Sequence, residues 1–192
     1  PNQTHVNSME FVTIASEGNG VDFGDLPNLD IVSGFEGSSP TRGIIAGGRY
    51  ESSSWYNNIS YVTISTTGNA ADFGDMTVAR SNHASSITNA VRMVMPGAVV
   101  TPGGSTYNNT IDYITMATLG NAIDFGDQGA GSEASASGSN STRGVCFIGS
   151  PTAGNILEFV QIMSTGNAID FGDLSAARRV YSACSNGHGG LG

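Results

Sequence analysis

Apolar residues fall in short groups along this chain, and each group is bounded by glycine, serine, threonine or asparagine. Residues 44–46 and 145–148 are continuous apolar runs, as expected for strands that are buried on both faces. No segment maintains the 3.6-residue spacing of an amphipathic helix. The pattern therefore predicts an all-β protein built from many short strands.

The same pattern of apolar and polar residues returns along the whole chain. Its most constant part is the sequence Asp-Phe-Gly-Asp, at residues 22–25, 72–75, 124–127 and 170–173, and a Gly-Asn pair precedes each copy. The first aspartates of successive copies are 50, 52 and 46 residues apart, so about four repeats fill the 192 residues. A period of this size is typical of propellers, solenoids and repeat arrays. We therefore interpret residues 1–192 as a single repeat domain.

Each repeat contains a hairpin of constant length. An aromatic residue stands 11 residues before the first aspartate of every copy: Phe11, Tyr61, Tyr113 and Phe159. We expect this residue to open one strand, the aromatic-led strand, and the Asp-Phe-Gly-Asp motif to lie in the next, the motif strand. The Gly-Asn pair is placed at the turn between them, because glycine, and less readily asparagine, supplies the positive φ of tight hairpins.

Two further strands are expected in each repeat. An apolar run that begins with an arginine is interpreted as a buried strand, the arginine strand. These runs lie at 41–48, 90–95 and 142–149, and their arginines are Arg42, Arg92 and Arg143. Residues 76–80 and 174–178, with the small residues after them, are interpreted as a fourth strand that follows the motif strand. The corresponding residues 128–132 are rich in glycine, so a looser sheet edge is expected there.

The connection between the arginine strand and the aromatic-led strand carries most of the length variation between repeats. A constant frame with variable loops at one place is a common way to build a binding surface. The first connection holds Tyr50, Trp55 and Tyr56, and the second holds Tyr107. Aromatic side chains beside serine and asparagine can stack on sugars or anchor a protein partner. The alternative interpretation, that Trp55 covers the apolar edge of its own sheet, stays open.

Four short strands per repeat, at about 48 residues each, predict the blades of a β-propeller. Part of this repeat resembles a kelch repeat, in which a double glycine ends one strand and an aromatic-led strand follows. The residues that carry the resemblance are the pair Gly47-Gly48, residues 58–61, Phe73 and residues 76–80. The sequence departs from the kelch pattern, because Phe73 stands where kelch repeats have tryptophan and the double glycine is lost after Met95.

The longer phrase Thr-Gly-Asn-Ala-x-Asp-Phe-Gly-Asp, at residues 67–75 and 165–173, is similar to repeats in kelch-like structural proteins of marine bacterial viruses, especially those of cyanobacteria. The resemblance implies a non-enzymatic virion module: a tail fibre, spike or capsid-surface protein that contacts other virion proteins and host surface glycans. A cellular or secreted carbohydrate-binding propeller is the alternative. Closure of the ring within one chain and completion of the ring by several subunits or a longer protein both stay open, the first being slightly favoured.

Composition narrows the classes of partner. The formal net charge is −9, and seven arginines with no lysine leave no basic stripe. Binding to nucleic acid and adsorption to an anionic membrane are therefore not expected. The two cysteines, Cys146 and Cys184, are not in a metal-type pair, and two buried free thiols are favoured over a disulfide.

The repeated aspartates make up half of the 16 acidic residues, and we interpret them as structural. They are Asp22, Asp25, Asp72, Asp75, Asp124, Asp127, Asp170 and Asp173. Calcium loops place oxygen ligands at alternating positions, which this motif does not do, so carboxylates that bond backbone amides at a bulge are favoured over a metal site. Arg42, Arg92 and Arg143 are expected to pair with these aspartates between neighbouring blades. No metal or other cofactor is predicted.

Enzymatic activity is not expected. The sequence has no zinc-protease, serine-hydrolase, Walker or dinucleotide-binding motif, and its three histidines fall at unrelated positions of the repeat. A propeller glycosidase or lyase would need convergent carboxylates outside the repeated motif. The non-repeated candidates Glu36, Glu51 and Glu133 are scattered along the chain.

Overall fold

The computed structural model describes residues 6–27, 33–50, 54–81, 85–100, 106–132, 136–149, 154–178 and 182–185. Every regular element in these ranges is a β-strand, and all strand pairings are antiparallel. The expected all-β class is confirmed. Over the same ranges, no helix is long and apolar enough to cross a membrane.

Three sheets of four strands share one up-and-down topology. Sheet I contains β3 (Phe35–Ser38), β4 (Arg42–Ala46), β7 (Asn58–Thr63) and β8 (Ala71–Asp75). Sheet II contains β9 (Ile87–Thr88), β10 (Arg92–Pro96), β11 (Asn108–Thr115) and β12 (Ile123–Ser132). Sheet III contains β13 (Ser137–Ser139), β14 (Arg143–Ile148), β15 (Gly154–Gln161) and β16 (Ile169–Arg178).

Two smaller sheets complete the described fold. The N-terminal pair consists of β1 (Ser8–Phe11) and β2 (Val21–Asp25), which correspond to the aromatic-led and motif strands of the other repeats. A short hairpin of β5 (Arg49–Tyr50) and β6 (Ser54–Trp55) lies in the connection between β4 and β7.

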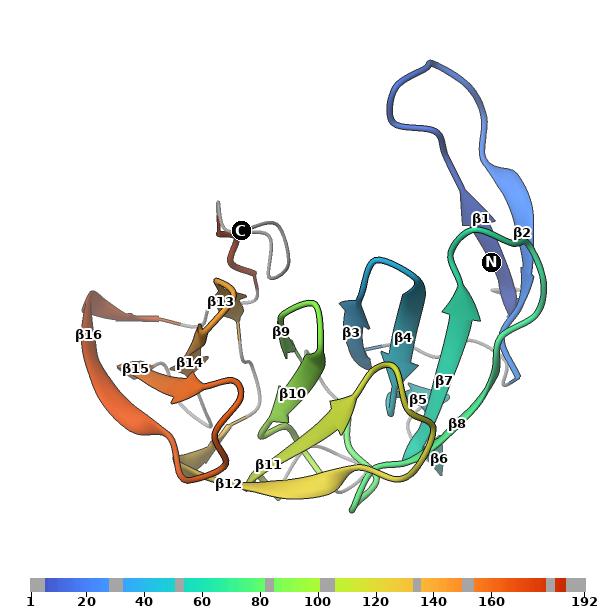
Figure 1. The fold of residues 1–192 in the computed structure, drawn as a ribbon. Helices are drawn as coiled ribbons and strands as arrows, with labels where there is room; N and C mark the ends of the chain where they lie inside the picture. The colour runs from blue at the N-terminus through green and yellow to red at the C-terminus, as the bar shows by residue number, and fades with distance from the viewer. Residues whose placement is uncertain are drawn as a thin grey trace, which may run out of the picture.

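The sheets follow one another along an open arc (Figure 1). The strands β3, β9 and β13 lie on the inner side of this arc, and the motif strands β8, β12 and β16 lie on its outer side. Contacts between β3 and β9 and between β9 and β13 agree with this arrangement. The N-terminal pair and sheet III stand at the two ends of the arc.

Hydroxyl groups link the inner strands at intervals of one repeat. The Ser139 Oγ donates to the backbone carbonyl of Thr88 at 2.8 Å, and the Ser185 Oγ donates to the carbonyl of Ser139 at 2.7 Å. Residues 182–185 therefore lie beside β13, at the place that the inner strand of a further sheet would take.

Two apolar clusters fill the spaces between neighbouring sheets. The first lies between sheets I and II, and the second lies between sheets II and III. The first includes Phe35, Ile44, Ile59, Phe73, Met93, Met95, Ile114 and Met116; the second includes Ile87, Val94, Ile111, Phe125, Cys146, Val160 and Ile162. Burial of each large side chain contributes about 1.5–3 kcal/mol, so the sheets are held to one another mainly by these clusters.

The position of the fourth strand differs from the expectation. Residues 76–80 are not a strand, and residues 174–178 continue β16, which also contains the motif. The fourth strand begins later, directly before the arginine strand, and pairs with it as β3 with β4, β9 with β10 and β13 with β14. These strands are only two to four residues long, so their hydrophobic pattern is too short to predict a strand.

The glycine-rich residues 128–132 are also different from the expected loose edge. They extend β12, and Gln128 and Ser132 are buried there. Small residues at this place allow close packing: a Cβ on Gly131 would lie 2.5 Å from the backbone oxygen of Tyr107. The expectation treated glycine as a sign of looseness, whereas here it permits contact.

Candidate binding surface

The Asp-Phe-Gly-Asp motif forms a bulge in each motif strand, as expected. In sheet I, Ile59 pairs with Gly74 and Ser60 pairs with Asp72, which leaves Phe73 as the extra residue. The same shift in register occurs opposite Gly24, Gly126 and Gly172. All four glycines have φ between +131° and +145°, a conformation that residues with a Cβ rarely adopt.

This bulge receives the Gly-Asn turn of the next sheet. The Gly120 N–H donates to the Phe73 carbonyl at 2.8 Å, and the Asp75 N–H donates to the Asn121 Oδ1 at 3.0 Å. A Cβ on Gly74 would overlap with the carbonyl of Gly120. Glycine is therefore required at Gly74 for close approach as well as for its φ value.

Two other junctions repeat this docking. The turn at Gly68-Asn69 binds the motif of β2, and the turn at Gly166-Asn167 binds the motif of β12. The last motif is different, because a Cβ on Gly172 would have no heavy atom of the described residues within 4 Å. The motif of β16 thus presents an open docking position.

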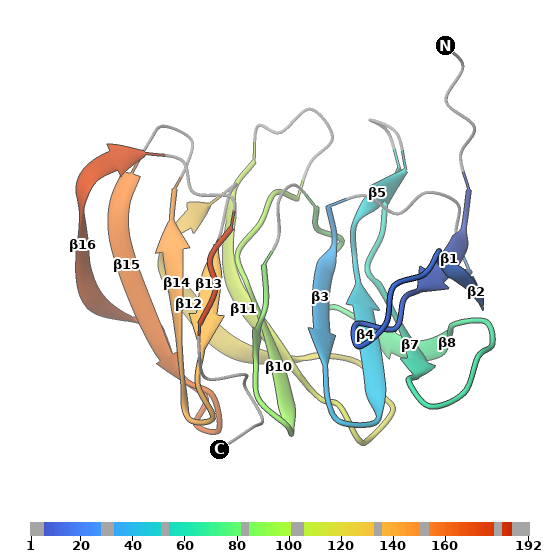
Figure 2. The ribbon, with the colours of Figure 1, turned by 90° about the horizontal axis from the view of Figure 1, so that it is seen from above.

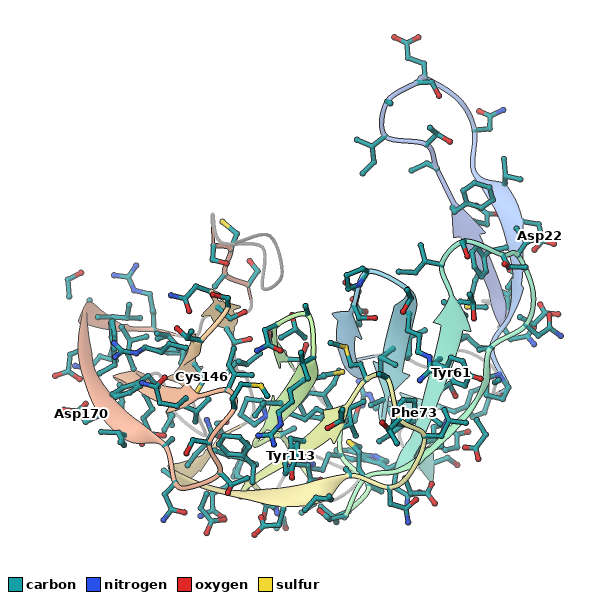
Figure 3. The ribbon with its side chains drawn as sticks, viewed as in Figure 1. Asp22, Tyr61, Phe73, Tyr113, Cys146 and Asp170 are labelled. Carbon is teal, nitrogen blue, oxygen red and sulfur yellow. The ribbon has the colours of Figure 1, made fainter. Side chains whose placement is uncertain are left out.

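The carboxylates of the motif mostly face solvent. Seven of the eight are exposed, and Asp25 is half-buried. Asp22 and Asp170 lie at the two ends of the arc on its outer side (Figure 3). The Asp170 Oδ1 accepts a bond from the Gly172 N–H at 3.2 Å, as expected at a bulge. The hydrogen bonds that the motif makes to the next sheet use its main chain instead of its carboxylates. No group of three or more potential metal ligands is found in the described part of the chain.

The arginine strand contacts aromatic rings instead of the motif aspartates, so the expected Arg–Asp pairs are wrong for these three arginines. The guanidinium carbons of Arg42, Arg92 and Arg143 lie 4.4–4.7 Å from the ring centroids of Tyr61, Tyr113 and Phe159. Each ring in turn makes an edge-to-face contact with the phenylalanine of its motif, as Tyr61 does with Phe73 at 6.1 Å (Figure 3).

Two of these arginines also reach the next sheet. The Arg42 Nη1 donates to the Met116 carbonyl at 2.7 Å, and the Arg92 Nη1 donates to the Ile162 carbonyl at 3.2 Å. The expected contact between sheets is therefore present for Arg42 and Arg92, with backbone carbonyls as partners in place of aspartates.

A buried ion pair joins sheets I and II. The Arg80 Nη2 lies 2.7 Å from the Asp112 Oδ2, and both side chains have 0% exposure. The Arg80 Nη1 donates to the carbonyls of Gly97 and Thr110, and Asp112 also accepts bonds from the Thr77 N–H and hydroxyl. Burial lowers the pKa of Arg80, and the charge of Asp112 opposes this effect.

Glu158 occupies the position of Asp112 in sheet III, but no arginine stands at the matching place. The residue that corresponds to Arg80 is Ser132. The Glu158 carboxylate accepts the Gly129 N–H at 3.0 Å and is only 7% exposed. Burial raises the pKa of Glu158, the Gly129 hydrogen bond opposes this, and the charge of Asp170 adds to the increase. Sequence reasoning missed both carboxylates, although alignment of the repeats marks their shared position.

The cysteines differ in their surroundings. Cys146 is buried between sheets II and III, and burial raises the pKa of its thiol to about 12. Cys184 is exposed, so the expectation of two buried thiols is correct only for Cys146. Both thiols are free.

The predicted aromatic contact surface lies on the β5–β6 hairpin. Arg49 pairs with Trp55 and Tyr50 pairs with Ser54, and all three aromatic residues here, Tyr50, Trp55 and Tyr56, are half-buried. Figure 2 shows this hairpin at the rim opposite the turn between β7 and β8. Tyr107 directly precedes β11 and forms an isolated β-bridge with Val99. Glu36 is exposed on β3, whereas Glu51 and Glu133 lie outside the described residues.

The base of the hairpin is hydrogen-bonded to the main chain of Arg80. Gly47 and Gly48 have φ of +63° and +94°, and the Gly48 N–H donates to the carbonyl of Arg80. The Arg80 N–H donates to the carbonyl of Tyr56. The hairpin is thus hydrogen-bonded to the main chain of Arg80, whose side chain forms the buried ion pair. The double glycine noted in the sequence turns the chain into this hairpin.

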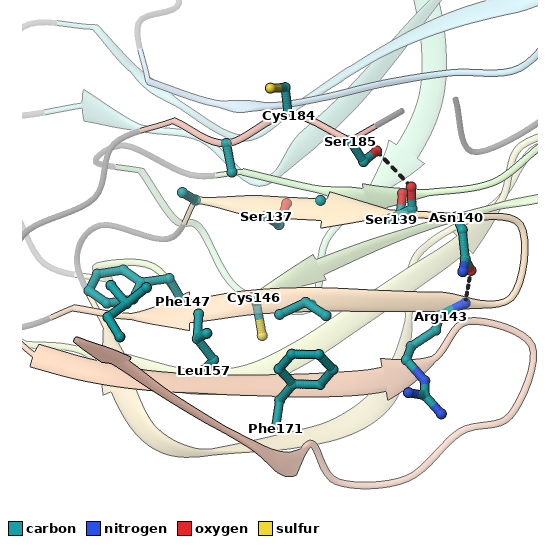
Figure 4. Close-up of a pocket in the computed structure, with 15 residues that line it drawn as sticks. Ser137, Ser139, Asn140, Arg143, Cys146, Phe147, Leu157, Phe171, Cys184 and Ser185 are labelled. Carbon is teal, nitrogen blue, oxygen red and sulfur yellow. Dashed lines mark hydrogen bonds between the residues drawn. The ribbon is translucent and has the colours of Figure 1, made fainter. Parts of the chain in front are cut away.

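A second concave surface lies on the free face of sheet III (Figure 4). This hollow of about 530 Å³ is lined by Val145, Leu157, Phe171 and Leu174, with Cys184 and Ser185 of the tail at one side. The hollow was not predicted from the sequence, because the residues that correspond to its lining in sheets I and II are buried.

Comparison with known proteins gives information on the fold only. No family model matches this sequence, and no curated protein matches it. A solved structure of YjhT is similar, with a TM-score of 0.67 and 9% sequence identity over 84% of this chain. This chain spans 58% of the length of the YjhT chain. At 9% identity, the similarity shows only that the two chains share a β-rich fold.

Proposed function

We propose that this chain forms part of a kelch-like β-propeller and serves as a non-enzymatic structural and adhesion module of a virus particle. Sheets I, II and III act as blades in this proposal, and the N-terminal pair is the outer half of another blade. The repeated four-stranded sheets, their order along an arc and the apolar clusters between them support the propeller.

The observation that supports the adhesion role is the aromatic hairpin, whose base is hydrogen-bonded to the main chain of Arg80. Tyr50 and Trp55 belong to the hairpin and Tyr56 directly follows it, and the Arg80 side chain is held in the buried ion pair. Aromatic residues held on a rigid frame lose little conformational entropy on binding, which suits them as anchors for sugars or proteins. The virion location and the partners, other virion proteins and host surface glycans, rest on the resemblance of the repeats.

The experiment compares binding of the purified protein and its Trp55→Ala variant to host cells and to a glycan array. Loss of a central aromatic anchor is expected to weaken binding about thirtyfold. Leu119→Ala is the matched control, since Leu119 is a 53% exposed apolar residue on the turn between β11 and β12, and this variant should bind normally. Unchanged binding by Trp55→Ala would refute the role of the hairpin.

Association with the particle is tested separately. An antibody against the protein should label intact virus particles, and mass spectrometry of purified particles should detect its peptides. Their absence from purified particles would refute the virion location while leaving the adhesion role to be judged by the binding experiment.

A further inference from the structure

We propose that copies of this chain dock head to tail, with the N-terminal pair β1–β2 of one copy on the free face of sheet III of another. This inference does not rest on the virion role. It rests on the two ends of the arc, which present the two unoccupied halves of the junction that joins the sheets within the chain.

The free face of sheet III matches faces that are covered in the other sheets. Val145, Leu157 and Phe171 correspond by repeat position to Val94, Ile111 and Phe125 of sheet II, all of which are buried against sheet III. The exposed fraction of the motif phenylalanine shows the difference: it is 3% for Phe125 and 51% for Phe171. Phe171 therefore lacks the neighbouring sheet that covers its equivalent.

The N-terminal pair exposes the opposite face. Val12 and Ile14 correspond to Ile114 and Met116, which contact sheet I. Ile114 and Met116 are 2% and 0% exposed, whereas Val12 and Ile14 are 61% and 99% exposed. Each end of the arc therefore exposes an apolar surface, and the two surfaces are the two opposite faces of a contact between sheets. Exposed apolar surfaces of this kind are typical of sites that bind another molecule.

The two main-chain parts of a junction, the motif bulge and the Gly-Asn turn, also lie at opposite ends of the arc. A Cβ on Gly172 would have no described heavy atom within 4 Å, and Gly18 and Asn19 of the N-terminal turn are exposed. By analogy with the other junctions, the Asn19 Oδ1 of one copy would accept the Asp173 N–H of another, as Asn121 accepts the Asp75 N–H.

Charged groups at the two ends are also complementary. Arg178 and Glu10 correspond to Arg80 and Asp112, the buried ion pair between sheets I and II. Both are exposed here, and the Arg178 Nε donates to the nearby carbonyl of Ala176 at 3.3 Å. Docking would place Arg178 of one copy against Glu10 of the other and cover both.

The C-terminal tail would contribute the inner strand of the shared sheet. Residues 182–185 lie beside β13 as the inner strand of a further sheet, and the Ser185 hydroxyl is bonded to the carbonyl of Ser139 (Figure 4). The docked pair β1–β2 would supply the two outer strands of that same sheet. The composite sheet therefore draws strands from both copies.

A second copy is the occupant that we favour, because one chain carries both halves but holds them at opposite ends of an open arc (Figure 1). A contact between two different surfaces is heterologous, and repetition of it yields a closed ring or a filament. Because the arc of one chain is open, a closed ring would contain two or more copies.

The first test is native mass spectrometry and analytical ultracentrifugation of the 192-residue chain over a range of concentrations. A dimer or larger closed assembly is expected. A chain that stays monomeric at the highest concentration of the range would overturn the proposal.

The second test uses variants that block one end each. Ile14→Asp blocks the N-terminal end and Phe171→Asp blocks the C-terminal end, and each variant alone should be monomeric with a folded circular dichroism spectrum. Their mixture should form a one-to-one dimer, because one intact surface of each type remains. No association in the mixture would overturn the head-to-tail arrangement, even where each single variant is monomeric.

The third test exchanges the proposed charges. Glu10→Arg and Arg178→Glu should each weaken association at least tenfold, and the double variant should regain most of the lost affinity. Glu17→Arg, which changes an exposed carboxylate of the same N-terminal hairpin, is the matched control. Failure of the double variant to recover, with both single variants folded, would overturn the Arg178–Glu10 contact and the register of docking that depends on it.

Discussion

Arg80 and Asp112, 32 residues apart in the chain, form a fully buried ion pair with an Nη2–Oδ2 distance of 2.7 Å. Arg80 follows sheet I and Asp112 lies in β11 of sheet II, so the pair connects two sheets through their apolar interface. Its remaining bonds go to backbone carbonyls and to Thr77. A buried charge that is paired and hydrogen-bonded in this way is very sensitive to loss of its partner.

Replacement of Arg80 by methionine is expected to destabilise the protein by about 3–5 kcal/mol, because Asp112 would be left as an uncompensated buried charge. Urea unfolding measures this change. The double variant Arg80→Met, Asp112→Leu should recover a large part of the loss, since replacement of both charges by apolar groups removes the uncompensated charge. A double variant as unstable as Arg80→Met would contradict this explanation.

Gly74 and Gly120 separate the steric role of glycine from its conformational role. Their φ values are +145° and +146°, yet a Cβ would meet the carbonyl of Gly120 at Gly74 and nothing within 4 Å at Gly120. Both alanine variants should lose about 1–3 kcal/mol from backbone strain. Gly74→Ala should lose about 1–3 kcal/mol more from the clash. Equal thermal stability of the two variants would show that the turn does not pack against the bulge.

Glu158 should make stability fall as pH rises from mildly acid to neutral. Burial raises its pKa above the ordinary value of 4.5, so the folded protein binds its proton more tightly than the unfolded chain does. The resulting stabilisation is complete below pH 4.5 and is lost as pH rises through the raised pKa. Glu158→Gln should remove this component of the pH dependence and be more stable than the wild type at pH 7. Parallel curves of unfolding free energy against pH for the two proteins would contradict the assignment.

The two thiols should react at very different rates. Cys184 is exposed, whereas the Cys146 thiol is buried and has a pKa raised to about 12, so it stays protonated at neutral pH. A thiol reagent at pH 8 should label one cysteine per folded chain and two per unfolded chain. Cys184→Ser should abolish labelling of the folded protein, and labelling of Cys146 on the same timescale would show that the interface between sheets II and III opens readily.

The candidate surfaces were accessible to sequence reasoning to different degrees. The aromatic residues Tyr50, Trp55 and Tyr56 were identified because they stand in a loop whose length varies between repeats, and the structure places them on one hairpin. The free face of sheet III was not identified. Its residues are apolar, as are the buried residues Val94, Ile111 and Phe125 of sheet II. Residue type therefore does not show that no described sheet covers this face.

The all-β class, the repeat, the hairpin of constant length and the arginine strand could be predicted from the amino-acid sequence. These features depend on hydrophobic periodicity and turn residues, which act over a few neighbouring positions. The partners of the charged groups became known from the three-dimensional arrangement: Arg42 stacks on Tyr61 instead of pairing with an aspartate, and Arg80 pairs with Asp112. The Asp-Phe-Gly-Asp motif likewise acquired its role there, as a main-chain receptor for the Gly-Asn turn of the next sheet. Such contacts join positions many residues apart, and their partners are set by how the sheets stack, which no local pattern encodes.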